Sequence, residues 1–517
     1  MSTGKYPLGT QNQAVARWAA VISLATLASR ILGFVRDVVI ARLFGIYIYA
    51  QAFVIAFRIP NLFRDLVAEG AANAAIVPVL SEYSVKRSKE EFWELANILL
   101  NLLLVILSVI TILGIIFSPL LVRMIAPGFI SSPEKLEATI RLNRIIFPYI
   151  LLIGLAAYAM AVLNSLKNFA VSAFAPCLLN ISIIIFALLF GEGIKGLASG
   201  ILVGGVLQLA IQVPVLYKKG FHPRFIFRLN HPGAVQIGRL MLPRVASSSI
   251  YQLNNFVDSI FGSLASIVGD GGVAVLYFSY RLIQFPIGIF SNALAQAILP
   301  TFSTQALEDN REGLKATLSW GLRAVFFVML PVTAVFMVLA GPLVFTLFGG
   351  GRFDLASGLL TSNALFFYSI GLCAYAGIKI LQSCFFALKD TVTPTKIAFL
   401  ALIMNIILNT ALMFPLKIGG LALATSISGI ISFLFLFYLL KTRLGGFGEH
   451  KILPAFLRML ASAFCMAGVC FLVNRALNLG WALLSGALSY IIFCFIFRVA
   501  ELKELTRWLA KRVEGSM

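Results

Sequence analysis

Charged residues are scarce in this sequence. Only 12% of its 517 residues are Asp, Glu, Lys or Arg, whereas an ordinary soluble domain contains about 25%. Histidine occurs three times, and the 21 acidic residues form no evident cluster with it. A membrane glycosyltransferase or phosphatase would need a metal-binding acidic cluster or a histidine–acid pair. The composition therefore argues against an enzyme, a bound metal or an organic cofactor.

Paired cysteines and a cleavable leader are also missing. The six cysteines show no paired spacing and all fall in apolar stretches, at positions 177, 373, 384, 465, 470 and 494. This pattern favours small buried side chains over disulfides or metal ligands. The N-terminal stretch MSTGKYPLGTQNQAVARW is polar, and no small-residue cleavage site follows a short apolar core. We therefore expect the first apolar segment to be a retained membrane span.

Long apolar runs are what the sequence does have. They recur from Val15 to Phe497, as in Ile98–Phe117 and Trp481–Phe497, and 60% of all residues are hydrophobic. About 20 apolar residues cross a ~30 Å hydrocarbon core. Because backbone groups in lipid must be satisfied within the segment, such runs form helices. We predict an all-α integral membrane protein with fourteen transmembrane helices between residues 14 and 498.

Basic residues are concentrated in alternate loops. The net charge is +20, and clusters occur at residues 86–89, 218–228, 441–451 and 503–512. The intervening loops carry one or two basic residues each. The positive-inside rule then places both termini in the cytoplasm. Because topology explains the charge, we expect no nucleic-acid partner, only the membrane lipids.

The chain repeats itself at an offset of about 222 residues. AAIVPVLSEY (74–83) returns as QAILPTFSTQ (296–305), and NSLKNFAVSAFAP (164–176) returns as FALKDTVTPTKIA (386–398). SPLLVRMIAPG (118–128) matches GPLVFTLFGGG (341–351) at offset 223. Each copy holds six predicted spans, an even number, so the copies are parallel. Transporters use such repeats to build two bundles around a substrate site near the midplane.

The repeat suggests four parts. We expect a six-helix lobe at 1–217, a basic cytoplasmic linker at 218–234, a second six-helix lobe at 235–441, and two extra helices with a basic cytoplasmic tail at 442–517.

Arginines occur inside the first two predicted spans. On a helical wheel Arg30, Arg36 and Asp37 fall with small polar residues in an arc of about 140°. The second span places Arg58 and Arg64 on a similar face. The second repeat offers Arg281 near the counterpart of Arg58. An arginine at mid-bilayer costs about 2.5–3.5 kcal/mol on the insertion scale, so these faces must meet protein or water.

Two interpretations of these arginines remain open. Internal ion pairs, Arg30 with Asp37 and Arg64 with Glu69, would give them a structural role. The cations outnumber the anions on these faces, however, and the surplus needs an anion. Arginine is suited to forked contacts with phosphate, which favours a phosphorylated or otherwise anionic substrate.

Several motifs resemble those of the MurJ/MviN family, the bacterial lipid II flippases. They are SRILGFVRDVVIARLFG (29–45), AFRIPNLFRDLVAEGA (56–71), VPVLSEY (77–83), LPR (242–244) and YRLIQFPIGI (280–289). The resemblance covers essentially the whole chain.

The resemblance implies a multidrug/oligosaccharidyl-lipid/polysaccharide exporter fold in the bacterial cytoplasmic membrane. It implies alternating access and export of lipid II, the undecaprenyl-diphosphate-linked peptidoglycan precursor, by a protein expected to act as a monomer. The implied head-group residues are Arg30, Arg36, Asp37, Arg58, Arg64 and Arg281. The two extra helices resemble the pair that forms a groove for the polyprenyl tail.

Two positions depart from the family pattern. Gln51 stands where many members have an aspartate, and Tyr280 stands where an acid is common beside Arg281. An acidic role cannot be carried over to either position. Both changes leave the expected cavity more positive.

Some members of the family resemble sodium-coupled carriers. Oxygen-bearing side chains here that suit a small hard cation are Asp258, Asn405, Asn409 and Thr425. Polar contacts between helices explain the same residues slightly better. The membrane potential offers another driving force, because moving an anion out of a negative interior gains about 2.3 kcal/mol per charge per 100 mV.

Two other transport functions compete with lipid II export. An exporter of the same fold could carry another polyprenyl-linked glycan, or it could carry drugs. A multidrug exporter more often presents acidic residues and aromatics to cationic substrates. The arginine-rich faces argue against that reading.

Overall fold

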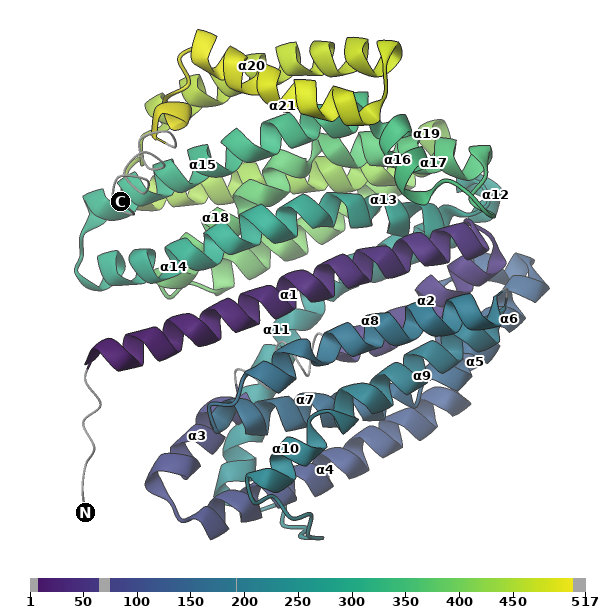
Figure 1. Ribbon diagram of the computed structural model, residues 1–517, viewed down its shortest axis with the longest axis vertical. Coiled ribbons are helices and arrows are strands. Elements are labelled where there is room, and N and C mark those ends of the chain that lie inside the picture. The colour runs from purple at the N-terminus through teal and green to yellow at the C-terminus, as the bar shows by residue number, and fades with distance from the viewer. Residues whose placement is uncertain (1–7, 65–74, 192, 505–517) are drawn as a thin grey trace. The chain divides into compact units, whose positions relative to one another are not determined.

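The computed structural model describes residues 8–64, 75–191 and 193–504, with side chains described for 20–62, 75–191, 193–241 and 252–504. These segments contain helices and no β-strand. The chain divides into two compact units (Figure 1). One comprises Met1–Leu264 with Gly351–Phe353, and the other comprises Ala265–Gly350 with Asp354–Met517.

The first unit contains eleven α-helices and one 3-10 helix among its described residues. They are α1 (Leu8–Phe44), α2 (Ile48–Arg64), α3 (Val77–Lys86), α4 (Lys89–Ile116), α5 (Ser118–Ile125), η2 (Pro127–Ser131), α6 (Pro133–Ile146), α7 (Tyr149–Ser165), α8 (Ala170–Phe190), α9 (Ile194–Ala210), α10 (Val213–Lys218) and α11 (Pro232–Ser263).

The second unit follows a similar order and adds two helices at its end. They are α12 (Ala265–Val268), α13 (Gly272–Pro286), the π-helix η3 (Ile287–Ser291), α14 (Asn292–Leu307), α15 (Arg311–Val338), α16 (Ala340–Phe348), α17 (Leu355–Ile370), α18 (Leu372–Ala387), α19 (Val392–Leu444), α20 (Glu449–Ala476) and α21 (Leu479–Ile496). The backbone of α19 is non-helical at Lys417, where the helix is kinked.

Apolar length supports a membrane protein. Nine helical segments among the described residues are long and apolar enough to cross a bilayer, and a tenth is obtained if α17 and α18, bent by 45°, form one span. The predicted all-α membrane class is confirmed. The count of fourteen spans stays a prediction.

The helix boundaries repeat along the chain as the sequence motifs do. Helices α4, α5 and α6 begin at Lys89, Ser118 and Pro133, and α15, α16 and α17 each begin 222 residues later. The caps repeat as well: Ser88 accepts a hydrogen bond from the backbone of Glu91, and Asn310 accepts one from Gly313. Such side chains satisfy free backbone N–H groups at a helix start.

Two glycines, each in a loop of one repeat, lie against a helix of the other repeat. Both contacts fall within the first unit. A Cβ on Gly128 would lie 2.0 Å from the Ser263 carbonyl oxygen at the end of α11. A Cβ on Gly351 would lie 2.2 Å from the Arg42 carbonyl oxygen near the end of α1. Backbone N–H groups add hydrogen bonds, from Gly128 to Ser263 Oγ (3.0 Å) and from Arg352 to the Arg42 carbonyl (2.8 Å). Each loop thus touches the first long helix of the opposite repeat.

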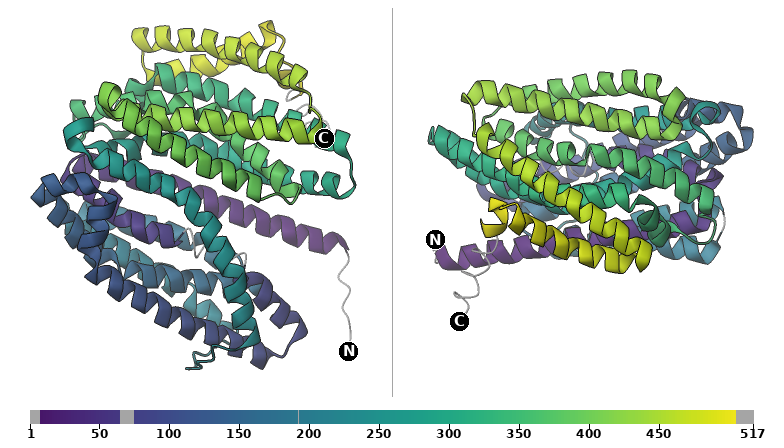
Figure 2. Two further views of the ribbon diagram at one scale, coloured as in Figure 1. Left: turned by 180° about the vertical axis from the view of Figure 1, so that it is seen from behind. Right: turned by 90° about the horizontal axis from the view of Figure 1, so that it is seen from above.

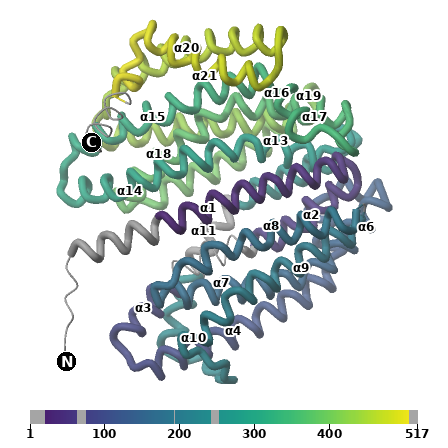
Figure 3. Tube along the Cα trace, in the orientation of Figure 1, coloured from purple at the N-terminus to yellow at the C-terminus, as the bar shows by residue number. Residues whose placement is uncertain are grey.

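The helix pair α8 and α9 is packed through glycine (Figure 3). Gly196, Gly200 and Gly204 recur every four residues along α9. A Cβ on Gly200 would lie 2.7 Å from the Ile183 Cα, and one on Gly204 would lie 2.9 Å from the Leu179 Cα. Small residues at this spacing let membrane helices approach closely. On its other side α8 packs against α1, so this pair positions the arginines of α1.

The final helices of the second unit, α20 and α21, lie at its edge against α15 (Figure 2). The Tyr490 hydroxyl donates to the Phe327 carbonyl oxygen at 2.9 Å. Arg323 of α15 forms an ion pair with Glu501, which follows α21, and both side chains are largely buried. A buried pair holds its partners together because either charge alone would be costly.

The predicted basic linker includes a non-helical stretch beside α4. Asn97 and Asn101 of α4 donate side-chain hydrogen bonds to the carbonyl oxygens of His222, Arg224 and Ile226. The Asn97 side-chain oxygen also accepts from the Arg224 backbone N–H at 2.6 Å. These contacts satisfy backbone groups that have no helical partner. The domain boundaries proposed for the chain stay predictions.

Candidate anion-binding site

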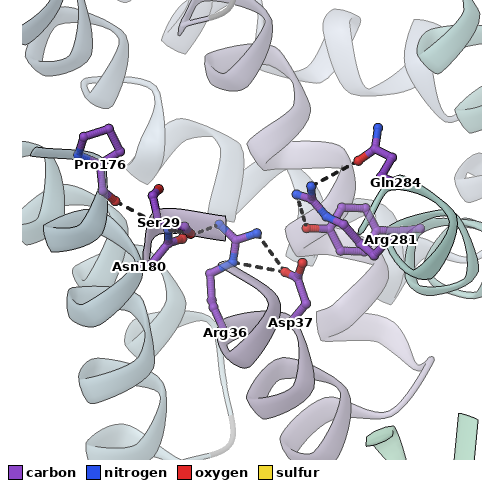
Figure 4. A network of polar contacts seen from close by, with 8 residues as sticks. Ser29, Arg36, Asp37, Pro176, Asn180, Arg281 and Gln284 are labelled. Carbon is purple, nitrogen blue, oxygen red and sulfur yellow. Dashed lines mark hydrogen bonds and ion pairs between the residues drawn. The ribbon is translucent and has the colours of Figure 1, made fainter. Parts of the chain in front are cut away.

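Arg36 is buried within the first unit and fully engaged. Its guanidinium donates to Asp37 Oδ1 from Nη2 (2.7 Å) and Nε (3.1 Å), and to Asn180 Oδ1 of α8 from Nη1 (3.1 Å) (Figure 4). The Phe57 ring lies 5.9 Å from the guanidinium carbon. A charge removed from water is stable only when paired and hydrogen-bonded. Arg36 therefore acts as a tie between α1 and α8.

Asn180 is the amide that completes this tie. Its Nδ2 donates to the carbonyl oxygens of Ser29 (3.2 Å) and Pro176 (3.4 Å), which fixes its oxygen toward Arg36. Gly33 faces the same amide, and a Cβ on Gly33 would lie 3.6 Å from Nδ2. The polar arc of α1 is thus partly a packing surface against α8.

Arg30 has different surroundings on the same helix. Its side chain is exposed. Its guanidinium forms no ion pair or hydrogen bond with the described residues, and Asp37 pairs with Arg36 instead. The alternative pairing of Arg30 with Asp37 is therefore absent from the described structure. An exposed, unpaired guanidinium retains all its donors for an external anion.

Arg58 of α2 is half-buried and contacts α11. Its Nη1 donates to the Asn255 carbonyl oxygen and to Ser259 Oγ. The Ser259 hydroxyl itself donates to the Asn255 carbonyl oxygen at 3.1 Å. Asp258 lies on this helical turn of α11. Arg58 therefore ties α2 to the turn of α11 that carries Asp258, a residue of the possible cation site.

Arg64 ends α2, and its side chain lies outside the described residues. Its candidate partner Glu69 lies outside them too, so the alternative ion pair of these two residues stays a prediction.

Arg281 is the candidate in the second unit. On α13 its Nη2 donates to the Tyr277 hydroxyl (3.0 Å) and its Nη1 to Gln284 Oε1 (3.3 Å). Its guanidinium carbon lies 4.9 Å from the Tyr277 ring centre. Tyr277 and Gln284 are neutral partners that orient this guanidinium.

The two departures from the family pattern have structural roles. Gln51 is buried in α2, and its Nε2 donates to the Ile46 carbonyl oxygen at 3.0 Å. The Tyr280 ring packs against Tyr368, with centroids 5.5 Å apart. Neither side chain brings a negative charge to the neighbouring arginines.

The candidate cation ligands of the second unit bond to one another. Asn409 Nδ2 donates to Asn405 Oδ1 (2.9 Å), Asn405 Nδ2 donates to Thr425 Oγ1 (3.0 Å), and that hydroxyl donates to the Leu421 carbonyl oxygen (3.1 Å). This chain connects the two arms of the kinked α19. Asp258 belongs to the first unit. Within the part of the chain that the structure describes, no group of three or more His, Cys, Asp or Glu could hold a metal.

Sequence reasoning missed the partners of the arginines. Asn180 is 144 residues from Arg36, and Ser259 is 201 residues from Arg58. An isolated asparagine in an apolar run was the available signal for Asn180. Lys379, a cation inside a predicted span, was also missed.

Comparisons with known proteins agree over most of the chain. A sequence profile described as Lipid II flippase MurJ matches residues 40–492. Lipid II flippase MurJ of Burkholderia cenocepacia is 34% identical over 89% of this chain and 90% of its own length. A probable lipid II flippase MurJ of Buchnera aphidicola is 36% identical over 80% of this chain and 81% of its own length.

Solved structures show the same fold. Lipid II flippase MurJ in an inward closed conformation has a TM-score of 0.80 at 28% identity, covering 92% of this chain and 98% of its own. An inward-facing multidrug resistance MATE family transporter of the MOP superfamily has a TM-score of 0.68 at 18% identity, covering 82% of this chain and 96% of its own. At that identity the second likeness concerns the fold alone.

Proposed function

This chain belongs to the MurJ family of lipid II flippases, and from that premise we propose that it moves lipid II across the bacterial inner membrane. The family consists of transporters, not enzymes, and the apolar helices fit a multi-pass inner-membrane protein. The cargo is the undecaprenyl-diphosphate-linked peptidoglycan precursor, carried from the cytoplasmic to the outer leaflet. Export of lipid II supplies peptidoglycan biosynthesis and thereby supports cell-wall biogenesis and cell shape.

Arg30 is the observation that carries the head-group site. It is a cation within α1 whose side chain is exposed and has no described partner. In a membrane such a residue is stable only beside water or an anion. We assign the diphosphate to Arg30 and place Arg58, Arg64 and Arg281 along the same path. Arg36 and Asp37 hold α1 in position beside them.

Alternating access would depend on movement of the two duplicated lobes. The lobes proposed at 1–217 and 235–441 would take turns in opening toward each leaflet, while the helices of 442–517 provide a groove for the polyprenyl tail. The linker at 218–234 and both termini would lie in the cytoplasm. The protein would work as a monomer, because a pair of lobes from one chain completes such a site.

The driving force has two candidate sources. Sodium coupling would use Asp258, Asn405, Asn409 and Thr425, and the membrane potential would act on the anionic cargo directly. The hydrogen-bonded chain through Asn405 favours a structural role for the three residues of α19. If sodium is coupled through Asp258, the change to Ala abolishes the sodium response of lipid II binding. An identical response in variant and parent contradicts the sodium site.

The decisive experiment is a leaflet-accessibility assay for lipid II in a bacterium depleted of its own flippase. Cells that express this chain should expose lipid II at the outer leaflet and resume growth. Accumulation in the cytoplasmic leaflet, despite normal insertion of the chain, would contradict the proposed function. Parallel assays with a different polyprenyl-linked glycan and with cationic drugs distinguish the related exporters.

A further inference from the structure

Lys379 is a cation inside the second unit that the site described above does not use. It lies on α18, eight residues before the last residue of that helix, Ala387. At 1.5 Å per residue this is about 12 Å of helix, whereas a lysine stem reaches about 6 Å. Snorkelling therefore does not carry its ammonium group to that end of the helix.

Helix α18 packs against α14, α15 and α19 (Figure 1). Ile380 lies against Gly321 of α15, 3.2 Å from the position of a Cβ there, and Ser383 Oγ donates to the Ala295 carbonyl oxygen of α14 at 3.3 Å. The side that α14 and α15 leave open on the C-terminal half of α18 carries Lys379, Gln382 and Phe386, which span an arc of about 60° on a helical wheel. Lys379 is exposed and Gln382 is partly exposed.

Another exposed surface of this unit differs in composition from the open side of α18. The exposed side of the first arm of α19 presents large apolar side chains, namely Phe399, Ile403, Ile406, Ile407 and Phe414. The open side of α18 instead carries a lysine and a glutamine beside Phe386. A polar stripe on a membrane helix indicates contact with protein or water.

The ammonium group of Lys379 has no partner among the described residues. Within the described residues no carboxylate forms an ion pair with it, and no side chain accepts a hydrogen bond from it. An intramembrane cation without a counter-ion needs an external anion when it leaves bulk water.

We propose that Lys379 is a second anion contact for the cargo, in which its ammonium group binds an oxyanion of lipid II from the second unit. This proposal rests on the proposed function. The oxyanion is a phosphate of the diphosphate or a carboxylate of the stem peptide, and an oxygen of either group can accept a hydrogen bond from an ammonium group, which is a compact point charge.

Binding measurements on the purified full chain separate these sources. Lys379→Gln should weaken lipid II binding about tenfold, the loss of one charge-assisted contact, while Lys379→Arg stays near the parent. The matched control is Lys396→Gln, an exposed lysine near the start of α19. Undecaprenyl diphosphate is the second probe: weakening with both probes assigns the phosphate, and weakening with lipid II alone assigns the stem carboxylate. Unchanged binding of both probes overturns the proposal.

Thiol labelling tests the surroundings of Lys379 without any cargo. In a chain whose six native cysteines are replaced, Lys379→Cys should react with a charged, membrane-impermeant reagent, and Ile407→Cys should not. Protection of both positions overturns the proposal even when the parent flips lipid II. The two proposals can fail separately. If the parent fails in the leaflet assay, the transport function is contradicted. The anion contact still stands if Lys379→Cys is labelled and Lys379→Gln binds lipid II more weakly.

Discussion

Arg30 and Arg36 have the same chemistry and opposite surroundings. Both occur on the polar arc of α1, six residues apart. Arg36 is 5% exposed and donates hydrogen bonds to Asp37 and Asn180, whereas Arg30 is exposed and forms no hydrogen bond or ion pair with the described residues. One arginine therefore holds helices together, and the proposed function assigns the other to the cargo.

Alanine variants should separate these roles. Arg36→Ala removes a buried partner of Asp37, so we expect the free energy of unfolding to fall by about 3 kcal/mol. Arg30→Ala should leave thermal unfolding unchanged and lower lipid II flipping at least about tenfold. Thermal unfolding in detergent and the leaflet assay measure the two effects.

Arg123→Ala is the control for these variants, because Arg123 is an exposed arginine in the last turn of α5. Equal stability losses for the Arg30 and Arg36 variants would contradict the division of roles.

Asp390 offers a pH-dependent contact at the turn between α18 and α19. Burial alone would raise the pKa of this carboxyl, but hydrogen bonds from Thr393 and the nearby Arg443 guanidinium hold the pKa below its usual 3.8. Arg443 Nη1 lies 2.6 Å from Asp390 Oδ2. A lowered folded-state pKa contributes stability above pH 3.8, and this stability is lost as the pH falls through the folded value.

Asp390→Asn should therefore reduce the free energy of unfolding by about 1 kcal/mol near neutral pH. The difference from the parent should shrink as the pH falls below 3.8. Thermal unfolding of parent and variant between pH 7 and pH 3 measures it, and a constant difference over that range would contradict the ion pair.

At the scale of elements, the sequence predicted more than at the scale of residues. Apolar length and the duplicated motifs predicted the helices and their repetition, because these signals are local or recur at one offset. The contacts of Arg36 with Asn180 and of Arg58 with Ser259 join segments far apart in the chain. A helical wheel identifies a polar face but does not tell which neighbouring helix supplies the partner.

A glycine of α9 gives a prediction about the packing of two helices. Gly200→Ala places a methyl group 2.7 Å from the Ile183 Cα of α8, so the two backbones must separate. We expect a loss of about 1–3 kcal/mol in the free energy of unfolding. Gly468→Ala in α20 is the matched control, since nothing lies within 4 Å of a Cβ there. Equal stability of both variants would show that α8 and α9 tolerate separation.

At the scale of the whole molecule, a buried ion pair ties the segment after the last helix to α15. Glu501→Ala leaves the Arg323 charge buried without this partner, which we expect to loosen α20 and α21 by about 3–5 kcal/mol. Hydrogen exchange along Glu449–Ile496 should rise while α8 and α9 stay protected.

Exchanging the two charges, in the double variant Arg323→Glu and Glu501→Arg, should restore much of that protection. If hydrogen exchange in the double variant is as fast as in Glu501→Ala, packing alone rather than the ion pair holds these helices.

The reciprocal contacts of Gly128 and Gly351 bear on how such a chain arose. The loop of each half closes on the first long helix of the other half. If the chain arose by duplication of a half-length ancestor, as the repeat predicts, such contacts would have joined two separate copies, as exchanged segments do in a domain-swapped dimer. Fusion of the two copies would then have required no new contact at these loops.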